Sequence, residues 1–333
     1  KMRLLSFALV SALVIGAVSV PLTDSALNTE FGEWARKFNK NYDSTEAKAK
    51  ALAAFSVHLA NIQSHNAFFA AGKATYSLGL NQYSDMTKAE IQEKILGFRS
   101  PNGNPANMAC HFATSPFNYS AVTPAPSVDW RTEGKVTMVK NQGQCGSCWA
   151  FSTVGAIEGA AAIANGFNWT SNSSGYSEME LVTCDPTDMG CQGGLMDHAF
   201  LYVQKNGGID TEKDWPYMQE AGCDQARETL NKAAGIETFG DVPINNVTAL
   251  KQAVTMQPVS VAIDASCDGF MNYKSGVLSD CGTMACYSSA SAPRTARSRP
   301  HSHLLSHLLG ERLHAHGGGR QRRRGQLRHP PVR

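Results

Sequence analysis

Apolar side chains recur at helical spacing in the first hundred residues of this chain. The repeat consists of aromatic and aliphatic residues three, four or seven positions apart: Phe31, Trp34, Phe38 and Tyr42, then Phe55, Ile62 and Phe69. Such a period gives a helix one apolar face that must pack against another element. We therefore expect a helical domain over residues 25–95.

The pattern changes after that domain. Residues 98–128 hold five prolines among Asn, Ser and Thr, which predicts a linker. Residues 148–165 are small and apolar and close on Asn165-Gly166, so they predict a helix with its stop signal. A further helix is predicted over 191–206. Residues 236–280 are strand-like, most clearly from Val259 to Ile263.

The N-terminus has the composition of an export signal. Lys1 and Arg3 precede an apolar run, which predicts a signal peptide over residues 1–20, with an uncleaved anchor as the alternative. Nine cysteines in an exported chain predict disulfides, and the odd number leaves a free thiol or an intermolecular bond. Four glycosylation sequons fit the same route: Asn118, Asn168, Asn172 and Asn246.

Charge is distributed unevenly along the chain. Ten of the 30 basic residues and one of the 28 acidic residues lie within 294–333, so that tail carries +9 and the remainder −7. The overall net charge of +2 therefore says nothing about the partners of the body. The run from Arg320 to Arg324 would suggest a nucleic-acid-binding protein, but this alternative rests on the tail alone.

One short segment carries the candidate chemistry. Residues 141–152 read Asn-Gln-Gly-Gln-Cys-Gly-Ser-Cys-Trp-Ala-Phe-Ser, so Cys148 stands where a glycine-rich loop becomes a helix. The unpaired N–H groups and partial positive charge of a helix N-terminus favour a thiolate. Gln142 precedes Cys148 by six residues, and its amide can donate to a developing oxyanion. A working nucleophile also needs a neighbouring imidazole.

This segment resembles the active-site motif of the papain-like cysteine proteases, closest to the cathepsin L type. Residues 129–131 resemble the start of a mature enzyme, and residues 177–184 and 190–197 resemble two further family signatures. The resemblance implies an α+β, papain-like two-domain fold. A helical left domain and a β-barrel-like right domain, here incomplete, would follow a helical inhibitory prodomain.

The resemblance implies a mechanism and two disulfides. Cys148 would attack the scissile carbonyl as a thiolate, while Gln142 and the Cys148 backbone N–H hold the oxyanion. No metal or organic cofactor is implied. Zinc binding by Cys145 and Cys148 is an alternative, although no second cysteine pair with metal spacing follows. The implied bridges pair Cys145 with Cys191 and Cys184 with Cys223.

The substrate site is also implied by the resemblance. The backbone of Gly193 and Gly194 would bind substrate as an added strand. Leu195, Met196 and Ala262 would line an apolar pocket for the second residue before the cut. Ordinary core packing is the alternative for these three side chains.

The helical region resembles the family's inhibitory prosegment. The spacing Phe55-x2-His58-x3-Ile62-x3-Asn66 is kept, but Ala47, Ala51 and His58 replace the usual Glu, Arg and first Asn. Residues 79–85 fit the family's Gly-x-Asn-x-Phe-x-Asp pattern with Tyr for Phe. We expect a lid that runs through the cleft and is released when the pH falls or a protease cuts near 115–128. An inert helical domain is the alternative.

The resemblance stops near Thr283. The family's His-Gly-Val and Asn-Ser-Trp-Gly strings are absent from residues 284–333. A change of reading frame explains their absence, because shifted codons force Gly at Met284-Ala285 and Leu at Cys286-Tyr287. The same frame permits His-Gly-Val-Leu-Leu-Val-Gly-Phe-Gly across 283–292; a genuinely different tail is the alternative. None of the tail histidines inherits the base role, so Cys148 lacks its imidazole.

These inferences predict five regions. They are a signal peptide (1–20), an inhibitory prodomain (25–95), a linker or activation region (96–125), an incomplete peptidase domain (126–283) and a disordered tail (284–333). We expect a monomeric cysteine endopeptidase zymogen that acts on peptide and protein substrates with an apolar residue at P2. Its own prodomain would inhibit it, in a lysosome-like or vacuole-like compartment or outside the cell. No nucleic acid is an expected partner, nor is a membrane after signal removal.

Two outcomes are open for the activity of this chain. We expect it to be inactive because its His and Asn segments are missing. The alternative function is that of a catalytically dead homologue that inhibits cysteine proteases through its prodomain.

Overall fold

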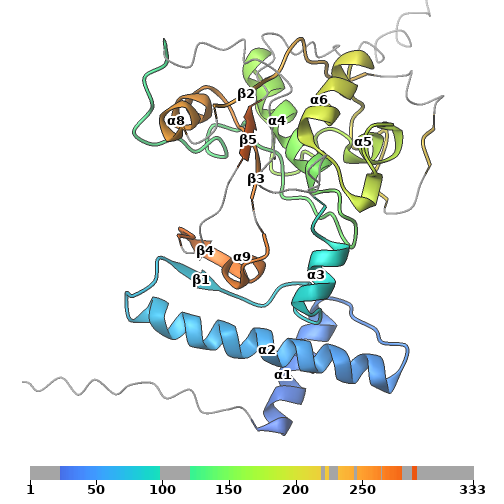
Figure 1. Ribbon diagram of the computed structural model, residues 1–333, viewed down its shortest axis with the longest axis vertical. Helices are drawn as coiled ribbons and strands as arrows, with labels where there is room; N and C mark the ends of the chain where they lie inside the picture. Colours follow the sequence, from blue (N-terminus) through green and yellow to red (C-terminus); the bar gives the residue numbers. More distant parts are fainter. Residues whose placement is uncertain are drawn as a thin grey trace, which may run out of the picture. The chain divides into compact units, whose positions relative to one another are not determined.

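The structure of the protein is a computed structural model, which describes part of the chain. It comprises residues 23–97, 121–218, 222–224, 232–243, 246–263, 265–279 and the backbone of 287–290. The chain divides into two compact units, Lys1–Ser298 and Arg299–Arg333, and every described element belongs to the first (Figure 1). The predicted signal peptide, most of the linker and the Arg-rich tail lie outside the described residues.

Two helices form the centre of the N-terminal domain. Helix α1 (Asp24–Lys37) packs across α2 (Thr45–Ala70), and both begin at hydroxyl N-caps, which satisfy free backbone N–H groups. Phe55 is fully buried, with its ring centroid 5.3 Å from those of Phe31 and Trp34. The helical spacing therefore predicted the packing face, although Phe69 is 40% exposed at the end of α2.

A short strand and a third helix complete this domain. The side chain of Asn66 on α2 holds β1 (Tyr76–Leu78) by bonding both the N–H and the C=O of Leu78, each at 2.9 Å. Helix α3 (Lys88–Lys94) begins with a capping box between Thr87 and Glu90. The polypeptide then continues from α3 to Gly97, and we define the N-terminal domain as residues 23–97, which include the first two residues of the predicted linker.

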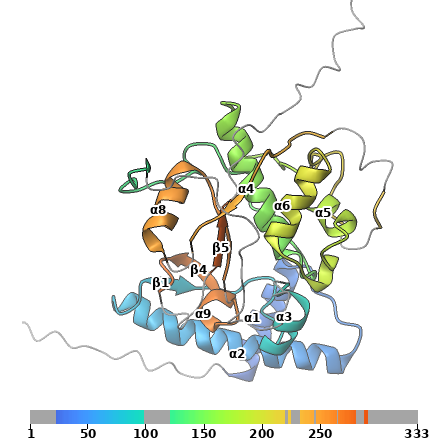
Figure 2. The same ribbon diagram turned by 45° about the horizontal axis from the view of Figure 1, so that its top comes forward.

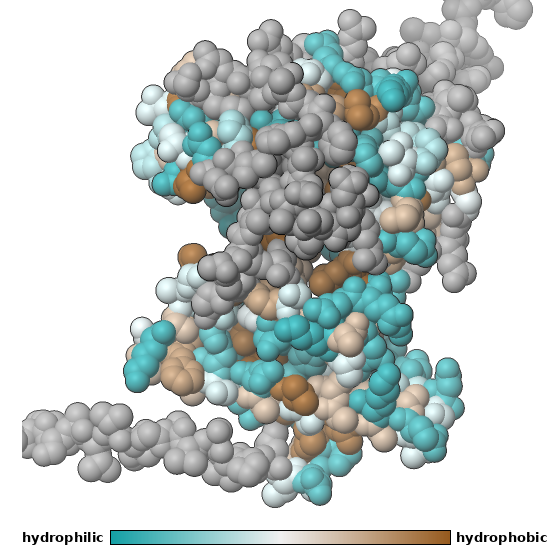
Figure 3. Space-filling model, viewed as in Figure 1, coloured by the Kyte–Doolittle hydropathy of each residue, from teal (hydrophilic) through white to brown (hydrophobic). Residues whose placement is uncertain are grey.

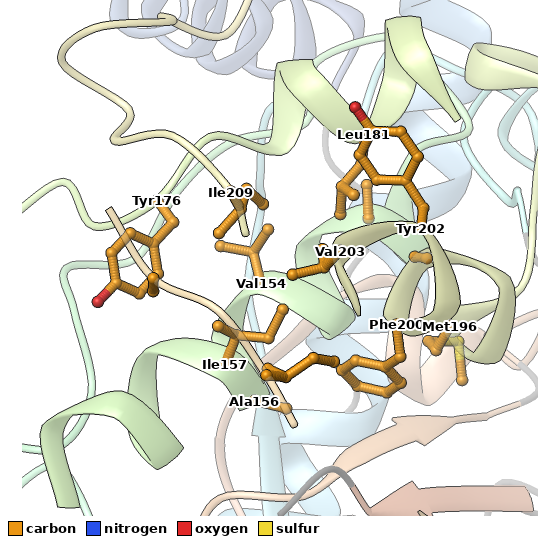
Figure 4. Close-up of a cluster of buried hydrophobic side chains, with 14 of the residues drawn as sticks. Val154, Ala156, Ile157, Tyr176, Leu181, Met196, Phe200, Tyr202, Val203 and Ile209 are labelled. Atoms are coloured by element: carbon orange, nitrogen blue, oxygen red, sulfur yellow. The ribbon is translucent and has the colours of Figure 1, made fainter. Parts of the chain in front are cut away.

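The largest core of the protein surrounds α4 (Cys148–Ala164). This helix is apolar on all sides, which is typical of a helix buried by its neighbours. It packs against α5 (Glu178–Cys184), α6 (Met196–Lys205) and β3 (Ser260–Ala262). Figure 4 shows the interlocking side chains, including Val154, Ile157, Phe200 and Val203, none of which is exposed. The short helix η3 (Gly190–Gln192) leads into α6.

The C-terminal part of the described chain combines strands with helices. A three-stranded antiparallel sheet has the order β2-β5-β3, with β2 at Gly240–Asp241 and β5 at Tyr287–Ala290. Helix α8 (Val247–Met256) precedes β3, and α9 (Asp268–Met271) precedes β4 (Tyr273–Gly276). Strand β4 pairs antiparallel with β1 of the N-terminal domain (Figure 2).

Three of the predicted elements need correction. Residues 236–280 are not uniformly strand-like, because Asn246 caps α8 and Ala249 and Ala253 form its buried face. The helix predicted over 191–206 begins only at Met196, since Gly193 has a φ of +119° that no helix accommodates. The expectation of disorder throughout 284–333 is wrong at β5, whose pairing uses backbone groups that every residue carries.

The surface shows no membrane-spanning feature in the described ranges. None of their helices is at once long and apolar enough to cross a bilayer. The coloured face in Figure 3 is mostly hydrophilic, with apolar side chains scattered among polar ones. Val57, Phe68 and Phe69 are exposed apolar residues of α2.

Candidate active site

Cys148 occupies the first position of α4. It is the one free cysteine among the described residues. The preceding residue, Ser147, is fully buried and hydrogen-bonds the hydroxyl of Tyr217 at 2.7 Å. Tyr217 in turn donates to the carbonyl of Gln142 at 3.0 Å. These bonds join both ends of the loop before α4 to Tyr217.

Two opposing effects act on the Cys148 thiol. Burial raises its pKa above the ordinary value because it disfavours the charged thiolate. Backbone hydrogen bonds from Gly97, Trp149 and Cys148 itself lower the pKa, but they offset only part of the burial effect. The expected benefit of the helix N-terminus is therefore present, yet the covered thiol is more weakly acidic than a free one.

The amide of Gln142 has two acceptors. Its Nε2 donates to the carbonyl of Cys145 at 2.7 Å and to the carbonyl of Ile95 at 3.0 Å. Ile95 belongs to the N-terminal domain and ends α3. The donor that sequence analysis assigned to an oxyanion is therefore bound to a backbone oxygen of that domain.

Disulfides brace the loops beside the nucleophile. The structure contains the bridges Cys145–Cys191 and Cys184–Cys223, which are the pairs that the family resemblance implied. The zinc alternative at Cys145 and Cys148 is wrong because the sulfur of Cys145 is already bonded to Cys191. Within the described ranges, no cluster of three or more ligating residues could hold a metal ion.

Gly193 and Gly194 form an extended segment before α6. The N–H of Gly194 donates to the carbonyl of Gly97 at 2.9 Å, which is the bond expected of an added strand. Only glycine fits at position 194, because a Cβ there would lie 2.6 Å from Asp188 and 2.7 Å from the Trp149 ring. The predicted substrate-binding backbone is thus in contact with the N-terminal domain.

The sequence analysis missed a pair that supports this segment. The carboxylate of Asp188 accepts from the N–H of Leu195 at 3.0 Å and contacts Nδ1 of His198 at 3.0 Å. The hydrogen bond to Asp188 raises the pKa of His198. The pair therefore joins α6 to the loop that carries Asp188. No sequence pattern marked the pair, because its members stand ten residues apart in a loop and a helix.

The three predicted pocket residues are all buried. Leu195 is 7% exposed, Met196 3% and Ala262 6%. Met196 and Ala262 pack in the core around α4 (Figure 4 labels Met196). Burial of this degree fits core packing and leaves the pocket assignment a prediction.

A cluster of buried charges lies under the loop before Cys148. Nζ of Lys140 contacts Glu158 Oε1 at 2.9 Å and Glu178 Oε1 at 2.6 Å. Burial raises the pKa of Glu178 to about 8, and Lys140 offsets part of that increase. Burial also raises the pKa of Glu158 and of Glu212. The neighbouring carboxylates of Glu158 and Glu212 raise the pKa of Glu178 further, because one ammonium offsets only part of the repulsion among them.

The N-terminal domain ends directly on the site. Besides the bonds of Ile95 and Gly97, the hydroxyl of Tyr83 donates to the carbonyl of Gly143 at 3.0 Å. A Cβ on Gly97 would lie 1.7 Å from the carbonyl oxygen of Gly146, so only glycine permits this approach. Sequence analysis predicted a lid, but it did not predict that Tyr83 and Gly97 would contact the site. The presence of a glycine at position 97 was the one sequence feature that could have indicated a close approach there.

Comparison with known proteins identifies this arrangement. Residues 124–291 match the family described as "Papain family cysteine protease", and residues 31–91 match "Cathepsin propeptide inhibitor domain (I29)". This chain belongs to the papain family. It is a papain-like cysteine peptidase zymogen whose N-terminal domain is an inhibitory prodomain, as the sequence motifs predicted.

Relatives of this papain-family chain include plant proteases. The senescence-specific cysteine protease SAG39 of Oryza sativa is 40% identical over 78% of this chain and 74% of its own length. The thiol protease SEN102 of Hemerocallis is 39% identical, covering 85% and 79%. Both similarities extend over the prodomain and the peptidase domain together.

Solved proenzymes share the fold. The proform of Amb a 11, a ragweed pollen cysteine protease, superposes with a TM-score of 0.67 at 33% identity over 80% of this chain and 79% of its own. Digestive procathepsin L2 of Tenebrio molitor gives 0.67 at 32% identity, covering 78% and 81%. The predicted papain-like α+β fold with a helical prodomain is confirmed.

Proposed function

We propose that Cys148 is the nucleophile of a cysteine endopeptidase whose own prodomain covers it. The thiolate would attack the scissile carbonyl, and water would later release the acyl group. The Gln142 amide and the N–H of Cys148 would stabilise the oxyanion. The observation that supports this most is the position of the free thiol at the start of α4, six residues after Gln142 and under the backbone of Gly97.

The substrate strand would replace the prodomain backbone. Gly194 N–H now binds the carbonyl of Gly97, and a substrate carbonyl would take that place after the prodomain leaves. The side chain of the second residue before the cut, P2, would enter the region of Leu195, Met196 and Ala262, which favours an apolar residue there. Peptides and proteins are therefore the proposed substrates, and the two disulfides support a secretory route that ends in a lysosome-like compartment or outside the cell.

We also propose that this polypeptide turns over substrate negligibly. The family's His-Gly-Val and Asn-Ser-Trp-Gly strings are absent from 284–333, and the match to the family ends at residue 291. A frame change near Thr283 would account for the missing strings. Without an imidazole to take its proton, a thiol whose pKa is raised by burial remains largely protonated at neutral pH.

The experiment compares three full-length chains: the unaltered chain, Cys148→Ala, and a copy with the histidine and asparagine segments restored. After removal of the prodomain, each is tested on a fluorogenic dipeptidyl amide with an apolar P2 residue and with an alkylating agent. We expect turnover only in the restored copy and alkylation of Cys148 in both chains that keep it. Thiol-dependent turnover by the unaltered chain would refute inactivity; an unreactive Cys148 in the restored copy would refute the nucleophile.

A second function is supported by the prodomain itself. It has its own aromatic core around Phe55, and it contacts Gln142, Gly143 and Gly194 through three separate hydrogen bonds. A catalytically dead chain could therefore inhibit other papain-family peptidases. Adding the Cys148→Ala chain to an active cathepsin tests this; unchanged cathepsin activity at micromolar concentrations excludes it.

A further inference from the structure

The prodomain meets the peptidase domain along a contact in which backbone atoms dominate. Strand β1 pairs with β4, and beside it Gly79 N–H donates to the carbonyl of Asn272 at 2.8 Å. The N–H of Val277 donates to the carbonyl of Thr75 at 2.9 Å. Because every residue except proline supplies both backbone groups, these bonds hold the prodomain with little dependence on the side chains of the peptidase surface.

One buried side-chain bond crosses the same contact. His58 projects from α2 of the prodomain, and Asn272 lies in the turn between α9 and β4 of the peptidase domain. Nδ1 of His58 is 2.9 Å from Nδ2 of Asn272, and the two residues are 8% and 1% exposed. The second ring nitrogen, Nε2, is 2.9 Å from the carbonyl of Met86. Water therefore has little access to either partner.

The surroundings determine which group donates. A carbonyl can only accept, so the proton of the neutral ring is on Nε2 and points to Met86. Nδ1 then carries the lone pair and accepts from the amide of Asn272. Turning that amide would place its Oδ1 against the lone pair of Nδ1. The ring of His58 thus requires a hydrogen-bond donor from the peptidase domain at position 272.

The other side-chain pairs across this contact, which also include Thr75 with Ser279 and the exposed amides of Gln82 and Asn141, are less demanding. Ser77 and Ser275 are 2.7 Å apart, and either hydroxyl can donate. Lys88 and Asp268 form an ion pair at 3.2 Å, but their side chains are 51% and 62% exposed. Exposed ion pairs are weak because water competes for both charges.

We propose that the bond between His58 and Asn272 determines which peptidase this prodomain accepts. The prodomain selects a papain-family peptidase that presents an amide donor at the place of Asn272, and it discriminates against one with an apolar side chain there. This inference rests on the proposed inhibitory function of the prodomain. The amide donor at this position would be recognised in addition to the backbone groups that pair with β1.

The test measures docking in the full-length chain by hydrogen–deuterium exchange of the backbone amides in 273–277 and at Gly79. The variants are His58→Phe, Asn272→Leu and the double substitution. Each single variant leaves a buried polar group without its partner, so exchange should accelerate roughly five- to a hundredfold. The double variant should accelerate far less than the product of the single effects, because its two new side chains suit each other. Lys88→Ala is the matched control, expected to change exchange less than about twofold.

Two results overturn the proposal: single variants that stay within twofold of the parent, or single effects that simply multiply in the double variant. Should His58→Phe disturb α2, as circular dichroism would show, Asn272→Leu decides alone, since it leaves the prodomain sequence intact. The underlying inhibition is checked separately by the alkylation rate of Cys148 in the parent chain. If Cys148 is alkylated slowly in the parent chain but the effects of the two substitutions are not coupled, only the proposed selectivity is refuted. If Cys148 is alkylated as fast as a free thiol, the inhibitory function itself is refuted.

Discussion

Replacement of Gly97 by alanine tests whether the prodomain backbone covers the nucleophile. The new Cβ would lie 1.7 Å from the carbonyl oxygen of Gly146 and 2.6 Å from its Cα. Both are backbone atoms of the loop that precedes Cys148, so neither can rotate away. Residue 97 must therefore move by about 1.5–2 Å to reach an ordinary contact distance.

A displacement of that size breaks the bonds that Gly97 makes to the site. Its carbonyl loses the N–H of Gly194, now 2.9 Å away, and its backbone loses the Cys148 sulfur. Two hydrogen bonds contribute about 1–3 kcal/mol to the docked state. Their loss raises the open population by roughly 5- to 150-fold.

The assay is the rate at which iodoacetamide alkylates Cys148 in the full-length chain, measured by mass spectrometry at one pH. Gly97→Ala should react faster by the factor above. Gly32→Ala is the control, because a Cβ at that position in α1 has no atom within 4 Å and should leave the rate unchanged. Equal rates for Gly97→Ala and the parent chain would refute the covering role of the prodomain backbone.

Three further predictions concern stability. Burial raises the pKa of Glu178 to about 8, so the folded chain keeps a proton that the unfolded chain releases near 4.5; this stabilisation is complete below about pH 4.5 and is lost as the pH rises through 8. Glu178→Gln should therefore flatten the fall of Tm between pH 5 and 8, and an equally steep fall would contradict the assignment. Lys140→Met removes the cation that offsets part of the burial effect on Glu158 and Glu178, so the pKa of both carboxyls should rise further and the free energy of unfolding should fall more at pH 7 than at pH 4.5, measured by urea unfolding; equal losses at both pH values would count against it. Phe55→Ala removes a fully buried ring and should cost the prodomain about 3–5 kcal/mol, seen as faster Cys148 alkylation; an unchanged rate would exclude coupling between that core and the lid.

Sequence patterns predicted those features whose signals are local. The loop-to-helix transition at Cys148 and the helix end at Asn165-Gly166 agree with α4 to within one residue. The period of the prodomain residues predicted which faces of α1 and α2 pack, including Phe31 and Phe55. The strand predicted from Val259 to Ile263 is present as β3, but the strand-like interpretation of 236–280 missed helices α8 and α9, because short strands and short helices share apolar residues and Asn246 was not recognised as a cap.

The partners of the site residues could not be derived in the same way. No pattern indicated that Ile95 would bind the amide of Gln142, 47 residues later. Nor did any pattern place His58 against Asn272, 214 residues away. Periodicity states which face of an element is apolar, but not which distant residue will meet it.

The amino-acid order was sufficient to predict the disulfide partners implied by the family and the helical prodomain, and to single out Cys148 as the proposed nucleophile, since these depend on short motifs and on spacing along the chain. Tertiary structure alone decided that burial outweighs the helix N-terminus at the Cys148 thiol, and that Gly97 closes over it. It also decided that Lys140 forms ion pairs with two buried carboxylates, those of Glu158 and Glu178. The reason is physical: desolvation and hydrogen bonding depend on atoms brought together in space, and those atoms come from segments that are far apart in sequence.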